Sequence, residues 1–236
     1  MKRFTLSLIA LLLAVLTAAL CGCLPEGADS SSEAVSSAEV SSETVSSEAV
    51  SEKPDEQTAF IRGSVKDGVY QNKLLGLRFA KPDVSWDFYS DEEIAELNGY
   101  VYELYDEETK EKLENTPVVY DMYAMDMYGN SINVNFENLG LVYGVLLSEA
   151  DYCTAGLAQM EEAFAGAGMA LRGSEIGKVT LGGKEHACIR LSVEMNGITV
   201  YETVAAVKCG KYMGVITMAS QDPDLPETFA AMFEKL

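Results

Sequence analysis

The sequence contains 236 residues, 48% of them hydrophobic, and its mean hydropathy is close to zero, which is the composition of a globular protein. Asp and Glu outnumber Lys and Arg by 37 to 17, so the formal net charge is -20. Nucleic-acid binding requires clustered Lys and Arg, and an anionic lipid surface repels a chain of this charge. The composition therefore argues against both as electrostatic partners.

The N-terminus has the pattern of an export signal. A positive start, Met1 to Arg3, precedes an apolar run without charge from Phe4 to Leu20. Such a run, with small residues near its end, is typical of a signal peptide. An uncleaved membrane helix is the alternative, because the run is close to the shortest length that spans a bilayer.

The residues that follow, Leu20-Cys21-Gly22-Cys23, resemble the lipobox of bacterial lipoproteins. The resemblance implies that residues 1–22 are removed and that Cys23 carries a diacylglyceryl group. Cleavage before Cys21 would leave the bulky Leu20 at the cut, so Cys23 fits better. We therefore expect an exported protein, held by lipid alone on the outer face of the cell membrane of a Gram-positive bacterium.

A low-complexity segment follows the expected lipidation site. Residues 31–50 contain four near-copies of a five-residue unit rich in Ser and Glu. Single valines among these residues cannot bury enough surface to offset the entropy of ordering. We predict a disordered tether over residues 23–58, with a Ser/Thr modification zone as the alternative, and one globular domain over residues 59–236.

The first half of the domain contains short elements. Strands are predicted at 68–72 and 75–80, and the spacing from Ser90 to Glu93 predicts a capped helix. Gly129-Asn130 is a hairpin signal between strands 118–128 and 131–138. Pairing across a two-residue turn predicts a core face and a solvent-exposed face. The core face would carry Tyr123, Met125, Met127, Ile132, Val134 and Phe136, and the exposed face Ala124, Asp126, Asn133 and Asn135.

The second half predicts a helix and a strand meander. Cys153, Leu157, Met160 and Phe164 form one apolar stripe on a helix from 148 to 166. Strands are predicted at 170–179, 185–195, 198–208 and 211–219, and a helix at 226–236. The strong turn signal Asn196-Gly197 sets Glu202 on an otherwise apolar face. The fold class is α+β, with an antiparallel β-sheet meander and helices packed on its faces.

One pattern extends through the domain. It runs from Tyr70 through Leu75-Gly76-Leu77-Arg78-Phe79 to Pro82 and Trp86, then to a central helix, Leu181-Gly182-Gly183 and a three-stranded meander. This order resembles the PsbP-like family, which is named for an extrinsic photosystem subunit and has similar domains in bacterial lipoproteins of unknown role. The resemblance implies an α/β/α sandwich. It assigns no functional residue.

Few residues offer catalytic chemistry. His186 and Cys188 would share one face of a strand, which suits a shared metal or a nucleophile with its base, but the sequence has no second His and no Cys-x-x-Cys to complete a zinc site. We interpret them as strand residues on a solvated face. Cys153, Cys188 and Cys209 are odd in number and scattered, so free thiols are expected.

A hard cation is a second possibility. The oxygen-bearing side chains of Asp126, Asn133, Asn135 and Glu137 would share the exposed face of the predicted hairpin, and calcium favours oxygen ligands. The segment lacks the spacing of a calcium-binding loop, so polar residues on an outer sheet face are the simpler interpretation. No cofactor is expected.

Tyrosines crowd one acidic segment of the chain. Tyr100, Tyr102, Tyr105 and Tyr120 lie there, and Tyr suits surfaces where one end of the side chain packs and the other stays in water. We predict a non-enzymatic, lipid-anchored binding or accessory domain with a protein or glycan partner. The alternatives are an enzyme that uses Cys188, His186 or surface carboxylates, and a structural component of the cell envelope.

Overall fold

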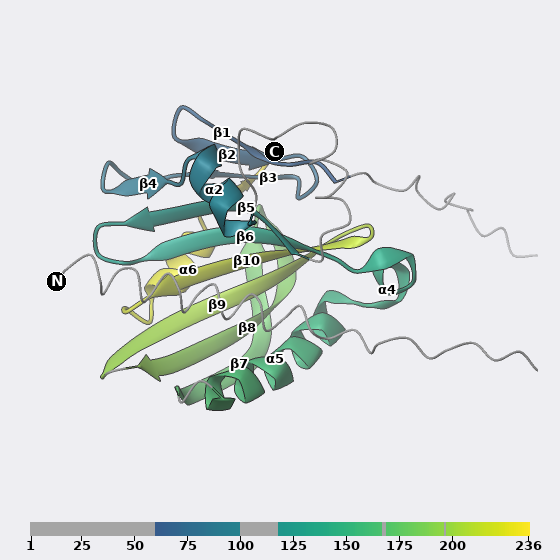
Figure 1. Ribbon diagram of the computed structural model, residues 1–236, viewed down its shortest axis with the longest axis vertical. Coiled ribbons are helices and arrows are strands. Elements are labelled where there is room, and N and C mark those ends of the chain that lie inside the picture. The colour runs from purple at the N-terminus through teal and green to yellow at the C-terminus, as the bar shows by residue number, and fades with distance from the viewer. Residues whose placement is uncertain (1–59, 100–117, 167–168, 196) are drawn as a thin grey trace, which may run out of the picture.

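The computed structural model describes residues 60–99, 118–166, 169–195 and 197–236, and this part of the chain has an α+β fold (Figure 1). Its strands form two antiparallel sheets. The smaller has the order β1 (Ser64–Lys66), β2 (Val69–Asn72), β3 (Leu77–Ala80) and β11 (Phe233–Lys235). The larger has the order β4 (Trp86–Phe88), β5 (Val118–Asp126), β6 (Ser131–Asn138), β10 (Tyr212–Ser220), β9 (Ile198–Cys209), β8 (Lys184–Met195) and β7 (Ala170–Leu181).

Helices cover both faces of the larger sheet. On one face, α2 (Asp91–Leu97) contacts β5 and α5 (Glu149–Gly166) contacts β7, β8 and β9. On the other face, α6 (Leu225–Ala230) contacts β10, β9 and β7. A fourth helix, α4 (Gly140–Leu146), lies beside the turn between β9 and β10. The prediction of helices on the faces of an antiparallel sheet is confirmed.

Two helices begin with side-chain caps, and the cap of α2 is the predicted one. Ser90 accepts a hydrogen bond from the backbone N–H of Glu93, and Glu93 accepts one from the backbone of Ser90, which completes the capping box of α2. Ser148 caps α5 by accepting from the backbone N–H of Asp151. The predicted stripe of α5 packs on the sheet, with Met160 and Phe164 fully buried.

The main core lies between the two sheets. Tyr70 and Phe79 of the smaller sheet pack with Met122, Val134 and Ile216 of the larger one. A second cluster lies between α5 and the opposite face of the larger sheet. The larger sheet is therefore covered on both faces, and the expectation of an exposed face over β5 and β6 is wrong.

The two hairpin predictions differ in outcome. Between β8 and β9, Leu191 pairs with Glu202 and Ile189 with Val204, as expected. Between β5 and β6 the predicted register is wrong by three residues next to the turn, and by four beyond the irregularity between Tyr120 and Met122.

The longer turn between β5 and β6 has a local cause. The backbone of Asp126 donates to the carbonyl of Asn130, and the Asp126 carboxylate accepts from the backbone N–H groups of Tyr128 and Asn130 at 2.8 and 2.9 Å. Gly129, with a φ of 89°, completes this turn in a conformation that glycine adopts readily. Because an odd shift exchanges the faces of a strand, Ala124 pairs with Ile132 and Tyr123 with Asn133.

The C-terminal helix is shorter than predicted. After α6 ends, Phe233 pairs with Phe79 on the neighbouring strand β3, and their rings stack with centroids 5.1 Å apart. The apolar spacing of this segment fits a helix, but burial of Phe233 between the sheets favours a strand.

Candidate functional site

Asp121 is a buried carboxylate at an irregularity in β5, where the pairing register with β6 shifts. It accepts hydrogen bonds from the Tyr70 hydroxyl at 2.6 Å, from Asn72 Nδ2 at 2.8 Å and from the backbone N–H of Gly63 at 2.9 Å. Burial raises the pKa of Asp121, and these hydrogen bonds act in the opposite direction. Asp121 therefore ties the start of the domain to both sheets.

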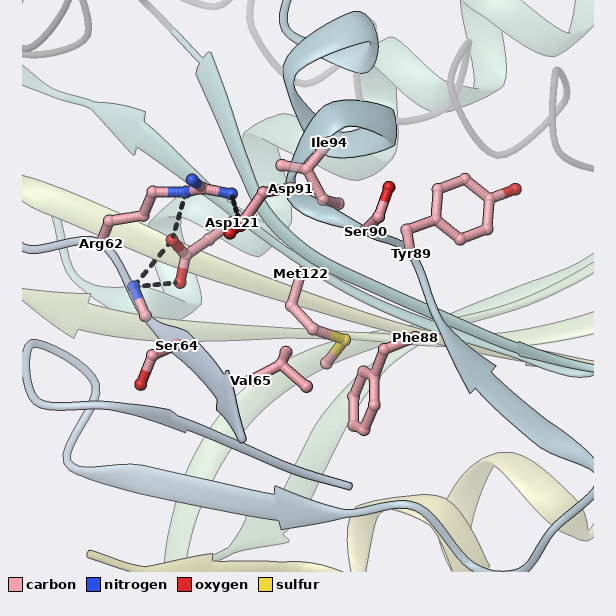
Figure 2. Close-up of a pocket in the computed structure, with 11 residues that line it drawn as sticks. Arg62, Ser64, Val65, Phe88, Tyr89, Ser90, Asp91, Ile94, Asp121 and Met122 are labelled. Atoms are coloured by element: carbon pink, nitrogen blue, oxygen red, sulfur yellow. Dashed lines mark hydrogen bonds and ion pairs between the residues drawn. The ribbon is translucent and has the colours of Figure 1, made fainter. Parts of the chain in front are cut away.

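A cleft of about 440 Å³ opens beside this carboxylate. Figure 2 shows Arg62 reaching between Asp121 and Asp91, with Val65, Phe88 and Met122 along an apolar side of the cleft. Arg62 Nη2 lies 3.0 Å from Asp91 Oδ1, and Arg62 Nε lies 3.9 Å from Asp121 Oδ1. The charged groups of the cleft are engaged with one another, which favours a structural role.

A different arrangement occupies the face of the larger sheet between α2 and α5. Five polar side chains lie on adjacent positions of four strands there, and we call them the polar stripe. One cross-strand row joins Tyr123 on β5, Asn133 on β6 and Thr217 on β10. The next row contains Ser131 on β6 and Glu202 on β9, which pair with the same residue of β10.

The polar stripe is buried and its hydrogen bonding is incomplete. All five side chains are at least 95% buried. Within the described part of the chain, no hydrogen-bond partner is present for Asn133 Nδ2, Glu202 Oε2 or Thr217 Oγ1, whereas the hydroxyls of Tyr123 and Ser131 lie close enough to interact with each other. Buried polar groups without partners are uncommon in folded proteins, because each costs about 1 to 3 kcal/mol. The polar stripe is therefore a buried polar patch with unmet hydrogen-bonding capacity on one face of the larger sheet.

Burial also changes the ionisation of the polar stripe. It raises the pKa of Glu202 from 4.5 to about 8, so this carboxyl group is largely protonated at neutral pH. It also raises the pKa of Tyr123, although the neighbouring Ser131 hydroxyl opposes the shift. The polar stripe therefore presents neutral hydroxyl, amide and carboxylic acid groups.

Aromatic and polar neighbours border the polar stripe. The rings of Tyr89 and Tyr123 lie with centroids 4.6 Å apart, and Tyr120 packs in the same cluster. At the other end, Glu137 accepts a hydrogen bond from the Tyr152 hydroxyl of α5 at 2.7 Å. Burial raises the pKa of Glu137, and that hydrogen bond opposes the shift.

The predicted cation ligands are not brought together. Asp126 pairs with Trp86 on the opposite face of the sheet and binds its own turn, so it is separated from Asn133, Asn135 and Glu137. Those three share a face, as predicted, but it is buried instead of exposed to solvent. Over the described ranges, no cluster of three or more His, Cys, Asp or Glu side chains is suited to a metal ion.

His186 and Cys188 are also buried, so their interpretation as residues on a solvated face is wrong. His186 Nδ1 lies 3.0 Å from Glu149 Oε1 of α5, whereas Cys188 packs in the core between the sheets. Burial raises the pKa of Cys188, which disfavours the reactive thiolate. Cys153, Cys188 and Cys209 are free, as expected.

Several predicted functional residues lie outside the described residues. These are Cys23, Tyr100, Tyr102 and Tyr105. Tyr120, the remaining member of the tyrosine group, pairs with Asn135 beside the polar stripe. The sequence signal that pointed to this face was Glu202, the one carboxylate on an apolar strand face.

Comparison with known proteins assigns neither a family nor a function to this chain. No protein-family model matches this sequence, and a search of curated proteins finds no match. In the parts of the chain that the structure covers, no helix is long and apolar enough to cross a membrane.

Proposed function

We propose that this chain is a binding domain of the bacterial cell envelope and that the polar stripe binds a neutral, hydroxyl-rich ligand such as a glycan unit. One observation carries the proposal: buried polar atoms of Asn133, Thr217 and Glu202 without partners among the described residues lie on neighbouring positions of one sheet face. A bound ligand with many hydroxyl groups would supply the hydrogen bonds that these atoms lack.

The chemistry of the polar stripe favours a neutral ligand. Ser, Thr and Tyr hydroxyls donate and accept, the Asn133 amide donates, and a protonated Glu202 does both without adding charge. An anionic ligand would meet a chain with a formal net charge of -20. Tyr89 and Tyr120 at the edge of the stripe add aromatic surface, which suits binding sites that combine packing with hydrogen bonding.

We also propose that the domain is exported and held by lipid on Cys23. The lipobox-like sequence Leu20-Cys21-Gly22-Cys23 and the preceding apolar run support this location. The PsbP-like assignment is likewise a proposal, supported by the order of strands and helices and by the buried positions of Tyr70, Phe79 and Trp86. A ligand from the cell envelope would suit a domain in this place.

A glycan array tests the proposed function. The exported chain is applied to neutral and charged oligosaccharides, together with the variants Glu202→Leu and Asn133→Leu. We expect binding to at least one neutral class, and a loss of at least about tenfold in affinity with either variant, since each removes a hydrogen-bonding group of the stripe.

A matched control separates ligand contact from loss of fold. Glu185 is an exposed carboxylate on β8 that pairs with the exposed Lys178, so Glu185→Leu should leave binding unchanged. Binding confined to charged glycans, or binding that is equal in all variants, would contradict the proposed site.

A further inference from the structure

A second groove lies at the edge of the larger sheet where β4 pairs with β5. It has a volume of about 360 Å³ and is lined by residues of β4, the first turn of α2 and the β5–β6 hairpin. Figure 1 shows β4 and the tip of this hairpin on the same side of the molecule, opposite α4. We call it the hairpin groove. It shares Phe88 and Tyr89 with the cleft beside Asp121, but different carboxylates line it.

One part of the hairpin groove is apolar and open to solvent. Val84 is 96% exposed and Met127 is 68% exposed, and Phe88 and Met125 line the groove with them. Met127 was expected on the core face, but it lies in the exposed turn of the hairpin. Contiguous exposed apolar surface with a polar rim marks an interaction site, and the flexible Met side chain adapts to partners of different shape.

The charges that line the hairpin groove are all negative. They belong to Asp87, Glu93 and Asp126, and none of the described residues that line the groove is Lys, Arg or His. Glu93 accepts from the backbone of Ser90, and Asp126 accepts from backbone N–H groups of its own turn. These donors carry no net charge, so they leave the negative charges uncompensated. Burial and the Glu93 carboxylate raise the pKa of Tyr89, which agrees with a negative potential in the groove.

Asp87 is the accessible carboxylate of this group. Its side chain is 91% exposed, and its Oδ1 atom lies 3.8 Å from Lys81 Nζ. That ammonium group also donates to the carbonyl oxygen of Trp86 at 2.9 Å, so Asp87 does not hold it alone. An exposed ion pair of this length contributes little to stability. Asp87 can therefore accept a cation from a partner at small cost.

The combination of exposed apolar side chains and carboxylates points to one kind of partner. We propose that the hairpin groove binds a cationic peptide segment, in which a large apolar side chain packs on Val84 and Met127 and flanking Lys or Arg side chains face Asp87 and Glu93. The apolar contact provides affinity, and the charges select and orient the peptide.

Other occupants fit the hairpin groove less well. A second copy of this chain carries a formal charge of -20 and presents the same carboxylates, so like charges would oppose its approach. A neutral glycan would leave the carboxylates of the groove without a cation. This site therefore differs from the polar stripe in the charge of its ligand, and it depends neither on the polar stripe nor on the proposed anchor.

Binding of synthetic peptides tests the proposal. Fluorescently labelled Lys-Leu-Lys-Phe-Lys is titrated with the whole chain in a neutral detergent, and binding is followed by fluorescence anisotropy. Glu-Leu-Glu-Phe-Glu and Lys-Ser-Lys-Ser-Lys serve as matched peptides without the positive charges and without the apolar side chains. We expect saturable binding of the first peptide, weaker binding of the other two, and a loss of affinity as the salt concentration rises.

Two pairs of variants assign the binding to the hairpin groove. Asp87→Lys should weaken binding of Lys-Leu-Lys-Phe-Lys by at least about tenfold, whereas Glu185→Lys, the same charge reversal on exposed β8, should change it by less than about twofold. Met127→Ser should weaken binding severalfold, and Val145→Ser on α4 should not, although Val145 is also exposed. All four side chains are exposed, so these variants leave the core unchanged.

Crosslinking locates the peptide directly. A benzophenone in place of the peptide Phe should crosslink within residues 84–89 or 125–128, as mapped by mass spectrometry. Crosslinks elsewhere, or equal binding of all three peptides, would overturn the proposal. Self-association of the chain that Met127→Ser abolishes, without peptide binding, would assign the groove to a second copy instead. Glu202→Leu should leave peptide binding unchanged, so failure of the glycan site and failure of the hairpin groove are distinguishable.

Discussion

Asn133 of β6 lies directly across from Thr217 of β10, and both side chains are buried with a polar atom that has no hydrogen-bond partner among the described residues. Paired positions in a sheet core ordinarily carry apolar residues. Ile189 of β8 and Val204 of β9, in the same sheet, are such a pair. Retaining the polar pair lowers stability, which is expected where binding a ligand is the function.

The stability cost of the polar stripe can be measured at Glu202. Glu202→Leu removes a buried carboxyl group and keeps most of its volume, so the free energy of unfolding at pH 7 should rise by about 1 to 3 kcal/mol. Urea denaturation measures this change. The exposed control Glu185→Leu should alter stability by less than about 0.5 kcal/mol. A clear loss of stability in Glu202→Leu would show that this carboxyl group has partners.

The pH dependence of stability provides a second test at the same residue. The pKa of Glu202 is about 8 in the folded state and 4.5 in the unfolded state, so the unfolded chain releases this proton first as the pH rises. Stability should therefore fall between pH 4.5 and about 8, with a slope of up to about 1.4 kcal/mol per pH unit from this group.

Glu202→Gln isolates that contribution, because glutamine does not titrate. The difference in unfolding free energy between the wild type and Glu202→Gln should change steadily over this pH window and level off above it. A difference that is constant from pH 5 to 8 would contradict a buried, protonated Glu202.

Asp121 should contribute to the free energy of unfolding and not to ligand binding. Asp121→Ala leaves the Tyr70 hydroxyl and the Asn72 amide without their shared acceptor, so the free energy of unfolding should fall by about 3 to 5 kcal/mol. The control is Asp87→Ala, since Asp87 is exposed and lies 3.8 Å from Lys81. Chemical denaturation of both variants measures the contrast, and equal small effects would contradict the structural role.

The lipid anchor expected on Cys23 predicts that the protein is found in the membrane fraction. Cys23→Ser should release the protein from the membrane fraction, whereas Cys21→Ser should leave it there, because only the first cysteine after the signal-peptide cut accepts lipid. Fractionation with metabolic lipid labelling measures both. Lipid retained in Cys23→Ser but lost in Cys21→Ser would show that the other cysteine is modified.

The sequence patterns predicted local elements better than their pairing. Ser90 and Glu93 define the cap of α2 through contacts between near neighbours, and Met195 pairs with Ile198 as the local turn signal predicts, so both were predictable. The β5–β6 turn was not, because the Asp126 side chain closes a longer turn than Gly129-Asn130 alone indicates. That three-residue difference exchanged the core and polar faces.

The candidate site was missed for a related reason. Asn133 and Asn135 alternate with apolar residues, and this pattern is typical of a strand with one face in solvent. Their burial depends on elements far apart in the chain, which no local pattern reports. Glu202 was the informative residue, since its register was predicted correctly and its carboxyl group had no apparent place on an apolar face.

The most direct measurement of the central claim is the side-chain amide signal of Asn133 in an NMR titration with a neutral oligosaccharide that the array identifies. We predict that saturable binding shifts this signal, and that Glu202→Leu weakens the shift while Glu185→Leu does not. An Asn133 amide that stays unchanged at saturating ligand, or that is already hydrogen-bonded to ordered water in the free protein and remains so, would contradict a binding role for the polar stripe.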